Sequence, residues 1–164
     1  MANSARALFP GDPAPAFDLL DQHGRIHSLQ AYHGQWLILF FYTKDNSPSC
    51  SKEALGFQDL LREFNRHGAK ILGVNLDSQQ RHAEFSEKNQ LEYSLLTDED
   101  ASVCQRYHCL FKLGPWRMVR RKTFIINTAG FIVRIHQKVQ ARQHARQVLD
   151  DLLLQQDLVL KKTG

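Results

Sequence analysis

The amino-acid sequence predicts an α/β fold in which helices flank a mixed central sheet, with a hairpin added at the N-terminus. Two continuous apolar runs of strand length, at residues 35–42 and 69–77, are typical of strands buried on both faces of a sheet. Segments with helical periodicity follow these runs, and an antiparallel pair of strands is predicted later in the chain. The length of 164 residues, with 43% hydrophobic and 23% charged residues, suits one globular domain over residues 1–164.

The first half of the chain is predicted to run hairpin, strand, helix, strand. After a Pro- and Ala-rich entry, "DQHG" at 21–24 suits the turn of a short hairpin, because His and Gly tolerate positive φ. The strand at 35–42 leads into one helix whose apolar side chains recur at helical spacing. Gly68 lies where the C-cap of that helix belongs, just before the strand at 69–77.

Two helices and a short strand are predicted next. A polar helix lies near 79–90, and a short strand lies at 93–97. Thr97 and Asp100 have the spacing of a capping box, so they predict the start of a further helix. The segment "LGPWRM" at 113–118 is predicted to be a loop.

The end of the chain is predicted to be a hairpin and a closing helix. Strands near 121–127 and 131–137 flank a turn at "NTAG". Amphipathic spacing of apolar residues then predicts a terminal helix. This order of elements is the plan of a thioredoxin-like fold with an N-terminal extension and an insertion.

Composition and charge limit the possible functions and location. No run of 18 apolar residues indicates a transmembrane helix, and the first residues lack the apolar segment of a signal peptide, so we expect a cytoplasmic protein. Three cysteines in a reducing compartment are interpreted as thiols and not as a disulfide framework. The net charge of +4 comes without a nucleic-acid-binding module, so we expect no nucleic-acid partner.

The segment "YTKDNSPSC" at 42–50 carries the chemistry. Ser47 is a good N-cap and Pro48 suits the first helical position, so Cys50 falls in the first turn of a helix. Unpaired backbone N–H groups and the positive end of the helix dipole favour a thiolate at that place. The alternative is a small, buried and inert cysteine. The cap, the proline and the preceding strand favour the nucleophile.

Four stretches carry a family resemblance: "GDPAPAFDLLDQHG", "FFYTKDNSPSCSKEA", "LLTDEDASVCQRY" and "RKTFIINTAGFI". With them the chain resembles the peroxiredoxins, and among these the bacterioferritin comigratory protein (peroxiredoxin Q) group. The family motif is Pro-x-x-x-Thr/Ser-x-x-Cys, which Ser47 and Cys50 match, while Thr43 replaces the proline. The resemblance implies that Cys50 attacks a peroxide. It also implies that Ser47 hydrogen-bonds the bound peroxide and the thiolate.

Two charged residues complete the site that the resemblance implies. The family's distal arginine precedes a strand of the form x-Ser/Thr-Phe-x-Ile, and Arg121 matches it. Strand alternation supports this match over Arg120, because Arg121 shares a face with Thr123. A guanidinium there stabilises a thiolate and polarises a peroxide oxygen, although a plain surface cation is the alternative. Glu53 matches a family acid that orients the arginine, or is an acid in the first turn that the helix dipole favours.

Two departures from the family pattern alter the expected chemistry. Thr43 adds a backbone N–H and a hydroxyl where a proline normally shields the thiolate. Leu55 occupies the position of the resolving cysteine in many relatives and cannot form a disulfide. Cys104 and Cys109 match no common resolving position, so a one-cysteine enzyme recycled by an outside thiol is expected. If local unfolding brings sulfurs together, either cysteine can still resolve Cys50.

A metal or organic cofactor is not expected. Cys104, His108 and Cys109 lie close together in the sequence, but three ligands without a second paired cluster do not match a zinc signature. The chemistry of a thiolate on a peroxide needs no metal, flavin or haem.

The sequence therefore predicts a thiol-dependent peroxidase that acts on hydrogen peroxide or small organic hydroperoxides. Its expected reductant is thioredoxin, glutaredoxin or a low-molecular-weight thiol, and we expect a monomer or weak homodimer with no membrane partner. Two alternatives stay open. One is a thioredoxin-like module that reduces thiol partners only; the other is a non-catalytic redox sensor, which the change to Thr43 keeps in consideration.

Overall fold

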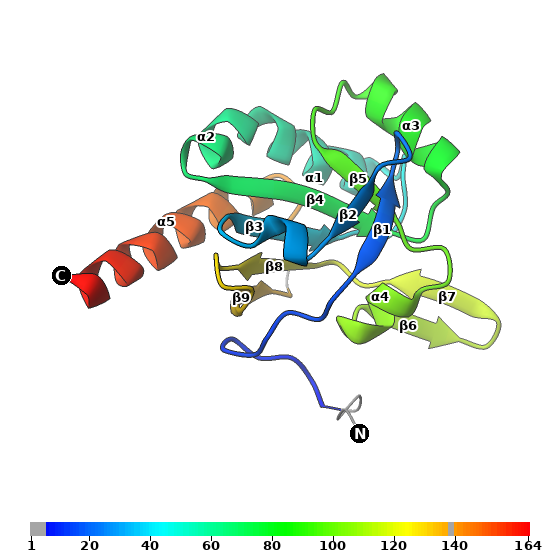
Figure 1. Cartoon of the computed structure of the whole chain (residues 1–164). Coiled ribbons are helices and arrows are strands. Elements are labelled where there is room, and N and C mark those ends of the chain that lie inside the picture. The colour runs from blue at the N-terminus through cyan, green and yellow to red at the C-terminus, as the bar shows by residue number, and fades with distance from the viewer. Residues whose placement is uncertain (1–5, 138–139) are drawn as a thin grey trace.

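A mixed seven-stranded sheet forms the centre of the computed structural model, which describes residues 6–137 and 140–164 (Figure 1). Its strands, in the spatial order β2-β1-β5-β4-β3-β8-β9, are β1 (Asp18–Asp21), β2 (Ile26–Ser28), β3 (Trp36–Phe41), β4 (Ala69–Asn75), β5 (Ser94–Thr97), β8 (Lys122–Ile126) and β9 (Ile132–His136). Strands β3, β4 and β5 are parallel, whereas β1 and β2 at one end and β8 and β9 at the other pair antiparallel. The predicted mixed sheet is therefore confirmed. The single-domain prediction for residues 1–164 includes residues 1–5 and 138–139, which lie outside the described residues, and it stays a prediction.

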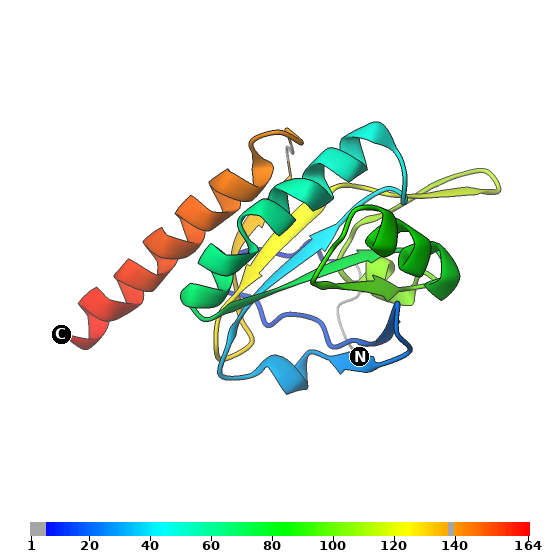
Figure 2. The same cartoon turned by 90° about the horizontal axis from the view of Figure 1, so that it is seen from above.

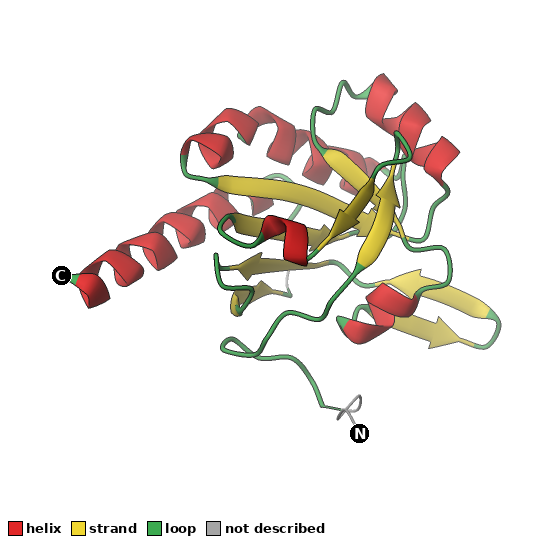
Figure 3. Cartoon of the chain, viewed as in Figure 1, coloured by secondary structure: helices red, strands yellow, loops and turns green. Residues whose placement is uncertain are grey.

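Helices cover both faces of the sheet, as Figures 2 and 3 show. The helices are α1 (Pro48–Asp59), α2 (Leu61–Arg66), α3 (Gln79–Lys88), α4 (Ser102–Arg106) and α5 (His144–Thr163), with a short 3-10 helix η1 at Gln30–Tyr32. Helices α1, α2, α3 and α5 lie on one face, and α4 lies with the N-terminal segment on the other. Among the described residues, no helix has the length and apolar character needed to cross a membrane.

Strand β3 divides the hydrophobic core into two layers. All six of its residues are buried, and because side chains alternate along a strand, they serve both faces. Ile38 and Phe40 pack in the layer under α1, α2, α3 and α5, which we call the upper core and which contains Cys50. Leu39 packs in the opposite layer, the lower core, which contains Cys104 and Cys109. The reactive-cysteine candidate and the other two cysteines are therefore on opposite faces of the sheet.

The helix after β3 begins as predicted but does not run unbroken to Gly68. The chain leaves helical geometry at Leu60, so that α1 and α2 are separate helices. The carbonyl of Leu60 still accepts a hydrogen bond from the N–H of Phe64 at 3.0 Å, so the break is a kink. Gly68 has a φ of +70°, which suits the predicted C-cap position.

The capping box predicted at Thr97 and Asp100 is wrong. Helix α4 begins only at Ser102, and the carboxylate of Asp98 accepts hydrogen bonds from the N–H groups of Val103 and Cys104. A buried carboxylate beside two unpaired N–H groups gains more from capping them than a threonine hydroxyl does, because its hydrogen bonds are charge-assisted.

The segment at 113–118 is not a loop. Strands β6 (Leu110–Leu113) and β7 (Trp116–Val119) form a separate two-stranded hairpin, which turns at Gly114 with a φ of +59°. The Gly-Pro pair forms the turn between two short strands, and the sequence prediction did not recognise these strands. The two hairpins that were predicted, at the N-terminus and across "NTAG", are both confirmed.

Candidate active site

The segment between β3 and α1 has the capped helix start that the sequence predicts. Ser47 is the N-cap of α1, and its Oγ accepts a hydrogen bond from the N–H of Cys50 at 3.2 Å. Its carbonyl accepts a second bond, from the N–H of Ser51, at 2.9 Å. Pro48, which has no N–H to satisfy, is the first helical residue. These contacts hold Cys50 in the first turn, at the positive end of the helix dipole.

The guanidinium of Arg121, 71 residues later in the chain, contacts this cysteine. Arg121 lies just before β8, and its Nη2 is 3.4 Å from Sγ of Cys50. Strand β8 pairs with β3 antiparallel, which returns the chain to the end of β3 where α1 begins. Arg121 is half-buried, and Cys50 is 0% exposed. The sulfur is thus buried against a cation and is not enclosed by apolar groups alone.

The helix start supplies fewer free amides than the sequence prediction assumed. The N–H of Cys50 is paired with Ser47, the N–H of Ser51 is paired with the carbonyl of the same residue, and Pro48 has none. Among the first-turn groups that the structure describes, this leaves the N–H of Ser49 without a hydrogen-bond partner. The charged group in contact with the Cys50 sulfur is the guanidinium of Arg121.

Thr43 lies in the wall of a hollow beside the arginine. Its Oγ1 donates a hydrogen bond to the carbonyl of Val119 at 3.3 Å, which ties the segment after β3 to the end of β7. The hollow has a volume of about 550 Å³ and is lined by Thr43, Phe111, Met118, Val119, Arg120, Arg121 and Gln137. Arg121 both lines this hollow and contacts the buried Cys50, so its guanidinium lies between the hollow and the sulfur.

Glu53 lies one helical turn after Cys50 and is 1% exposed. Burial raises the pKa of its carboxyl to about 7, and the nearby charge of Arg121 opposes that rise. Within residues 6–137 and 140–164, neither carboxyl oxygen has a hydrogen-bond partner, so Arg121 acts on Glu53 through charge alone. The family-based role of Glu53 in orienting the arginine is not supported by a hydrogen bond here.

Sequence reasoning missed His144, which lies on the other side of Glu53. This buried first residue of α5 places Nε2 2.6 Å from Oγ1 of Thr123, in a hydrogen bond, and 3.8 Å from Oε1 of Glu53. Burial lowers the pKa of His144 to about 3, with the positive charges of His136 and Arg121 acting in the same direction. A histidine at i, i+4 and i+8 spacing with two buried apolar residues, Val148 and Leu152, was the available signal.

A second missed group anchors the segment before Ser47. Asp45 is buried and accepts a hydrogen bond from the hydroxyl of Tyr42 at 2.6 Å. Its other oxygen lies 2.7 Å from Nδ1 of His82, whose Nε2 lies 3.1 Å from the carbonyl of Leu96. Helix α3 and strand β5 thus hold this segment in place, and Tyr42 helps to do so.

The other two cysteines lie in a different environment. Cys104 and Cys109 are buried in the lower core, and burial raises the pKa of both thiols, that of Cys109 to about 12. The carboxylate of Asp98 adds to the rise at Cys104. All three cysteines are free thiols, and Leu55 lies partly exposed on α1.

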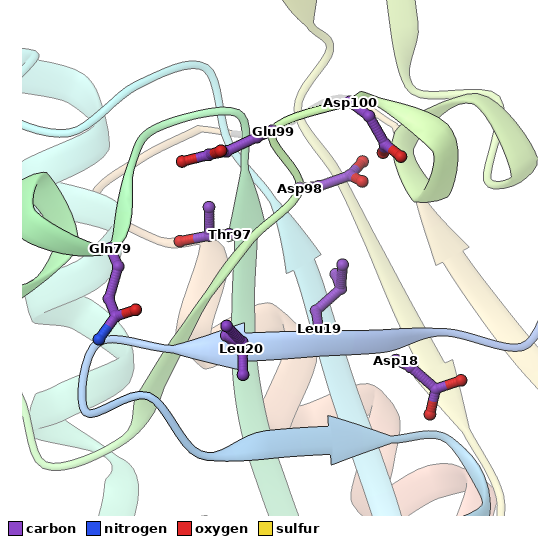
Figure 4. Close-up of a pocket in the computed structure, with 8 residues that line it drawn as sticks. All are labelled: Asp18, Leu19, Leu20, Gln79, Thr97, Asp98, Glu99 and Asp100. Carbon is purple, nitrogen blue, oxygen red and sulfur yellow. The ribbon is translucent and has the colours of Figure 1, made fainter.

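A second hollow, similar in volume to the one lined by Thr43 and Arg121, shares no residue with the predicted site. It has a volume of about 560 Å³ and lies between β1 and the segment after β5 (Figure 4). Its lining residues are Asp18, Leu19, Leu20, Gln79, Thr97, Asp98, Glu99 and Asp100. It holds no thiol and no cation, so it lacks the groups that the predicted chemistry needs.

Similarity in sequence to known proteins identifies the family of this chain. Residues 10–135 match the model of the AhpC/TSA family. The putative peroxiredoxin bcp of Coxiella burnetii is 35% identical over 146 residues, which cover 87% of this chain and 97% of that protein. The Peroxiredoxin Bcp of Xanthomonas campestris is 36% identical over 143 residues, covering 84% of this chain and 89% of its own.

Solved structures agree in fold. Peroxiredoxin Q of Xylella fastidiosa superposes with a TM-score of 0.86 at 30% identity, over 92% of this chain and 99% of that one. The bacterioferritin comigratory protein of Xanthomonas campestris, studied for alkyl peroxide reduction, gives a TM-score of 0.81 at 34% identity over 85% of this chain and 91% of that one. The predicted thioredoxin-like fold is confirmed. The chain therefore belongs to the AhpC/TSA family, within the bacterioferritin comigratory protein (peroxiredoxin Q) group of peroxiredoxins, which are thiol-dependent hydroperoxide reductases.

Proposed function

We propose that Cys50 is the nucleophile of this peroxidase and that it acts as a one-cysteine enzyme. The Cys50 thiolate attacks the terminal oxygen of hydrogen peroxide or a small organic hydroperoxide, the O–O bond breaks, and a sulfenic acid forms. The leaving oxygen takes up a proton and departs as water or an alcohol. The observation that carries the proposal is the 3.4 Å contact between the Cys50 sulfur and the guanidinium of Arg121.

Arg121 and Ser47 support this step in different ways. The guanidinium neutralises the thiolate and polarises the peroxide oxygen, since both are acceptors for its N–H groups. Ser47 accepts a bond from the N–H of Cys50, which leaves its own hydroxyl hydrogen free to be donated to the sulfur or to the peroxide.

Thr43 and Glu53 act at the edges of the site. Thr43 shapes the hollow through its bond to the carbonyl of Val119. Glu53 is close enough for charge to act between it and Arg121, so a protonated Glu53 leaves the arginine free to pair with the thiolate. As Glu53 ionises, it competes with Cys50 for the same cation.

An external thiol completes the cycle. It attacks the sulfenic acid to form a mixed disulfide and water, and a second thiol then releases the Cys50 thiolate and leaves as a disulfide. Cys104 and Cys109 lie in the lower core, across the sheet from Cys50, which supports an outside reductant of the thioredoxin, glutaredoxin or low-molecular-weight class. A cytoplasmic location and a monomer or weak homodimer belong to the same proposal.

Intact-mass analysis after one equivalent of hydrogen peroxide tests the proposal. The parent is expected to gain one oxygen, trapped on Cys50 by a sulfenic-acid reagent. Cys50→Ser is expected to gain none, while Cys104→Ser and Cys109→Ser behave as the parent does. Loss of two hydrogens that depends on Cys104 or Cys109 contradicts the one-cysteine mechanism and identifies a resolving partner.

Turnover separates the peroxidase from the two alternative functions. A supplied thiol system is expected to sustain many cycles of peroxide consumption. A single stoichiometric oxidation that no thiol renews indicates a redox sensor. A chain that exchanges disulfides but consumes peroxide no faster than a free thiol indicates a thioredoxin-like module.

A further inference from the structure

The β6–β7 hairpin presents an apolar face to solvent. The strand register pairs Phe111 with Met118 and Leu113 with Trp116, and alternation places these four side chains on one face. Leu113, Trp116 and Met118 are 66%, 71% and 52% exposed. We call this set of four residues the hairpin face. Contiguous exposed apolar side chains with an aromatic member are typical of surfaces that bind proteins.

The same hairpin is basic. The hairpin and the residue after it, 110–120, contain three cationic side chains, Lys112, Arg117 and Arg120, and no acidic one. Lys112 and Arg117 stand opposite each other on the side of the ribbon away from the hairpin face. Arg120 places its guanidinium 5.0 Å from the centre of the Phe111 ring, in a cation–π contact next to the apolar patch.

The hairpin reaches from the body of the molecule beside the proposed nucleophile. Figures 1 and 2 both show β6 and β7 extending away from the sheet. At its base, the carbonyl of Val119 accepts the bond from Thr43. Phe111 and Met118 line the hollow into which Arg121 also faces. A protein seated on the hairpin face therefore lies next to the hollow that is lined by Arg121, the residue in contact with Cys50.

We propose that the hairpin face is the docking surface for the reductant, and that this reductant is an acidic protein carrying a reactive thiol. The proposal rests on the proposed function, because only a Cys50 sulfenic acid without a resolving partner needs an external thiol. The apolar side chains supply the contact area, and the three cations of residues 110–120 select a partner with negative charge around its cysteine.

The positive charge of the hairpin also favours one of two occupants. A second copy of this chain, docked hairpin to hairpin, brings six like charges together, because residues 110–120 of each copy carry three cations and no acid. Like-charge contact suppresses association. An acidic thiol protein meets attraction instead, and its rate of association is expected to fall as salt is added.

The test separates the oxidising step from the reducing step. The peroxide-dependent loss of the Cys50 thiol is first measured without any reductant. The oxidised chain is then reduced either by a thioredoxin of net negative charge or by dithiothreitol, and the second-order rate constants are compared. Two variants alter the hairpin: Leu113→Ser with Trp116→Ser removes apolar contact area from the hairpin face, and Lys112→Glu with Arg117→Glu reverses the charge on the other side of the ribbon. Leu160→Ser, at a residue 70% exposed on α5, is the matched control.

The Leu113→Ser, Trp116→Ser variant is expected to slow reduction by the thioredoxin about tenfold or more, as loss of a central aromatic contact does in other interfaces. The charge-reversal variant is expected to slow the same reaction at low salt, because the attraction that steers an acidic partner is lost. Reduction by dithiothreitol and oxidation by peroxide are expected to stay within about twofold, and the control to match the parent. Equal slowing with both thiols, or no slowing with the thioredoxin, overturns the docking proposal. Hairpin-dependent dimerisation, or binding to anionic lipid vesicles in place of the thioredoxin, overturns it in favour of a second copy or a membrane. A parent that is not oxidised at Cys50 instead refutes the proposed function.

Discussion

Cys50 and Cys104 are equally buried, at 0% exposure, yet they lie among opposite charges. Cys50 is in the upper core, where the guanidinium of Arg121 touches its sulfur. Cys104 is in the lower core, where the carboxylate of Asp98 accepts a hydrogen bond from its backbone N–H and helps to raise the pKa of its thiol. Both are also near the start of a helix, α1 or α4.

Under the proposed function, this difference in neighbours separates the nucleophile from the other buried thiol. Burial disfavours any thiolate, and a position near a helix start is common to both residues, so neither property separates them. The two cysteines differ in the group that caps or faces the start of the helix. A neutral serine and an arginine surround Cys50, whereas an aspartate occupies the corresponding place beside Cys104. The predictions below change these neighbours one at a time.

Removing the cation is expected to have the largest effect. Arg121→Met keeps a long side chain but loses the guanidinium, so the peroxide-dependent oxidation of Cys50 is expected to slow about 100- to 1,000-fold, the typical loss for one charge-stabilising donor. Stopped-flow measurement of thiol loss gives the rate. Arg120→Met, one residue earlier and exposed, is expected to change it less than about threefold. Similar losses in both variants contradict the distinct role of Arg121.

Removing the neighbouring buried acid is expected to change the pH dependence of stability. Because burial raises the pKa of Glu53 from 4.5 to about 7, the folded state holds this proton more tightly than the unfolded state does. The parent therefore loses stability as pH rises from 4.5 through about 7, and Glu53→Gln does not. Between pH 5 and pH 8, the free energy of unfolding of the variant is expected to rise by about 2–3 kcal/mol relative to the parent.

Urea unfolding at the two pH values measures this difference. The lowered pKa of His144, near 3, removes stability as pH falls below 6.5, but it does so in parent and variant alike and cancels in the comparison. Glu87→Gln, on the exposed face of α3, is the control and is expected to stay within about 0.5 kcal/mol of the parent at both pH values. A constant difference between Glu53→Gln and the parent contradicts the raised pKa.

Changing the cap makes the surroundings of Cys50 resemble those of Cys104. Ser47→Asp keeps a capping oxygen but places a carboxylate beside the sulfur, so helix stability is expected to persist while oxidation slows. Ser47→Ala removes the cap, at a cost of about 1 kcal/mol in stability, and also loses the hydroxyl that is free to bond the peroxide. Its oxidation rate is expected to fall about tenfold, the equivalent of one hydrogen bond. If Ser47→Asp reacts as fast as the parent, local charge does not govern the thiol.

Sequence reasoning succeeded where local rules apply. The N-cap at Ser47, the buried strand β3 and the position of Cys50 follow from residues next to one another. Arg121 lies 71 residues from Cys50, and only the family resemblance with strand alternation could suggest it. His144 was not predicted because its role depends on contacts between residues far apart in the sequence. Asp98 was not predicted because its buried carboxylate caps α4 in place of the standard capping pair that the sequence suggested. The β6–β7 hairpin was not predicted because its strands are short and, in the described residues, pair only with each other.

Thr43, the departure from the family motif, is expected to have the smallest effect. Thr43→Val keeps the branched shape and loses only the 3.3 Å bond to the carbonyl of Val119, so stability is expected to fall by about 1 kcal/mol or less. Thr43→Pro restores the family residue. Tyr42 before it directly continues β3, and its N–H pairs with the carbonyl of Val74, which suits the extended backbone that a following proline requires. Oxidation rates of both variants are expected to stay within about threefold of the parent, with Thr43→Ser as the control that keeps the hydroxyl. A loss above about 3 kcal/mol in Thr43→Pro means that the backbone here has departed from the family geometry, and that Thr43 helps to hold the altered path between Cys50 and the hairpin.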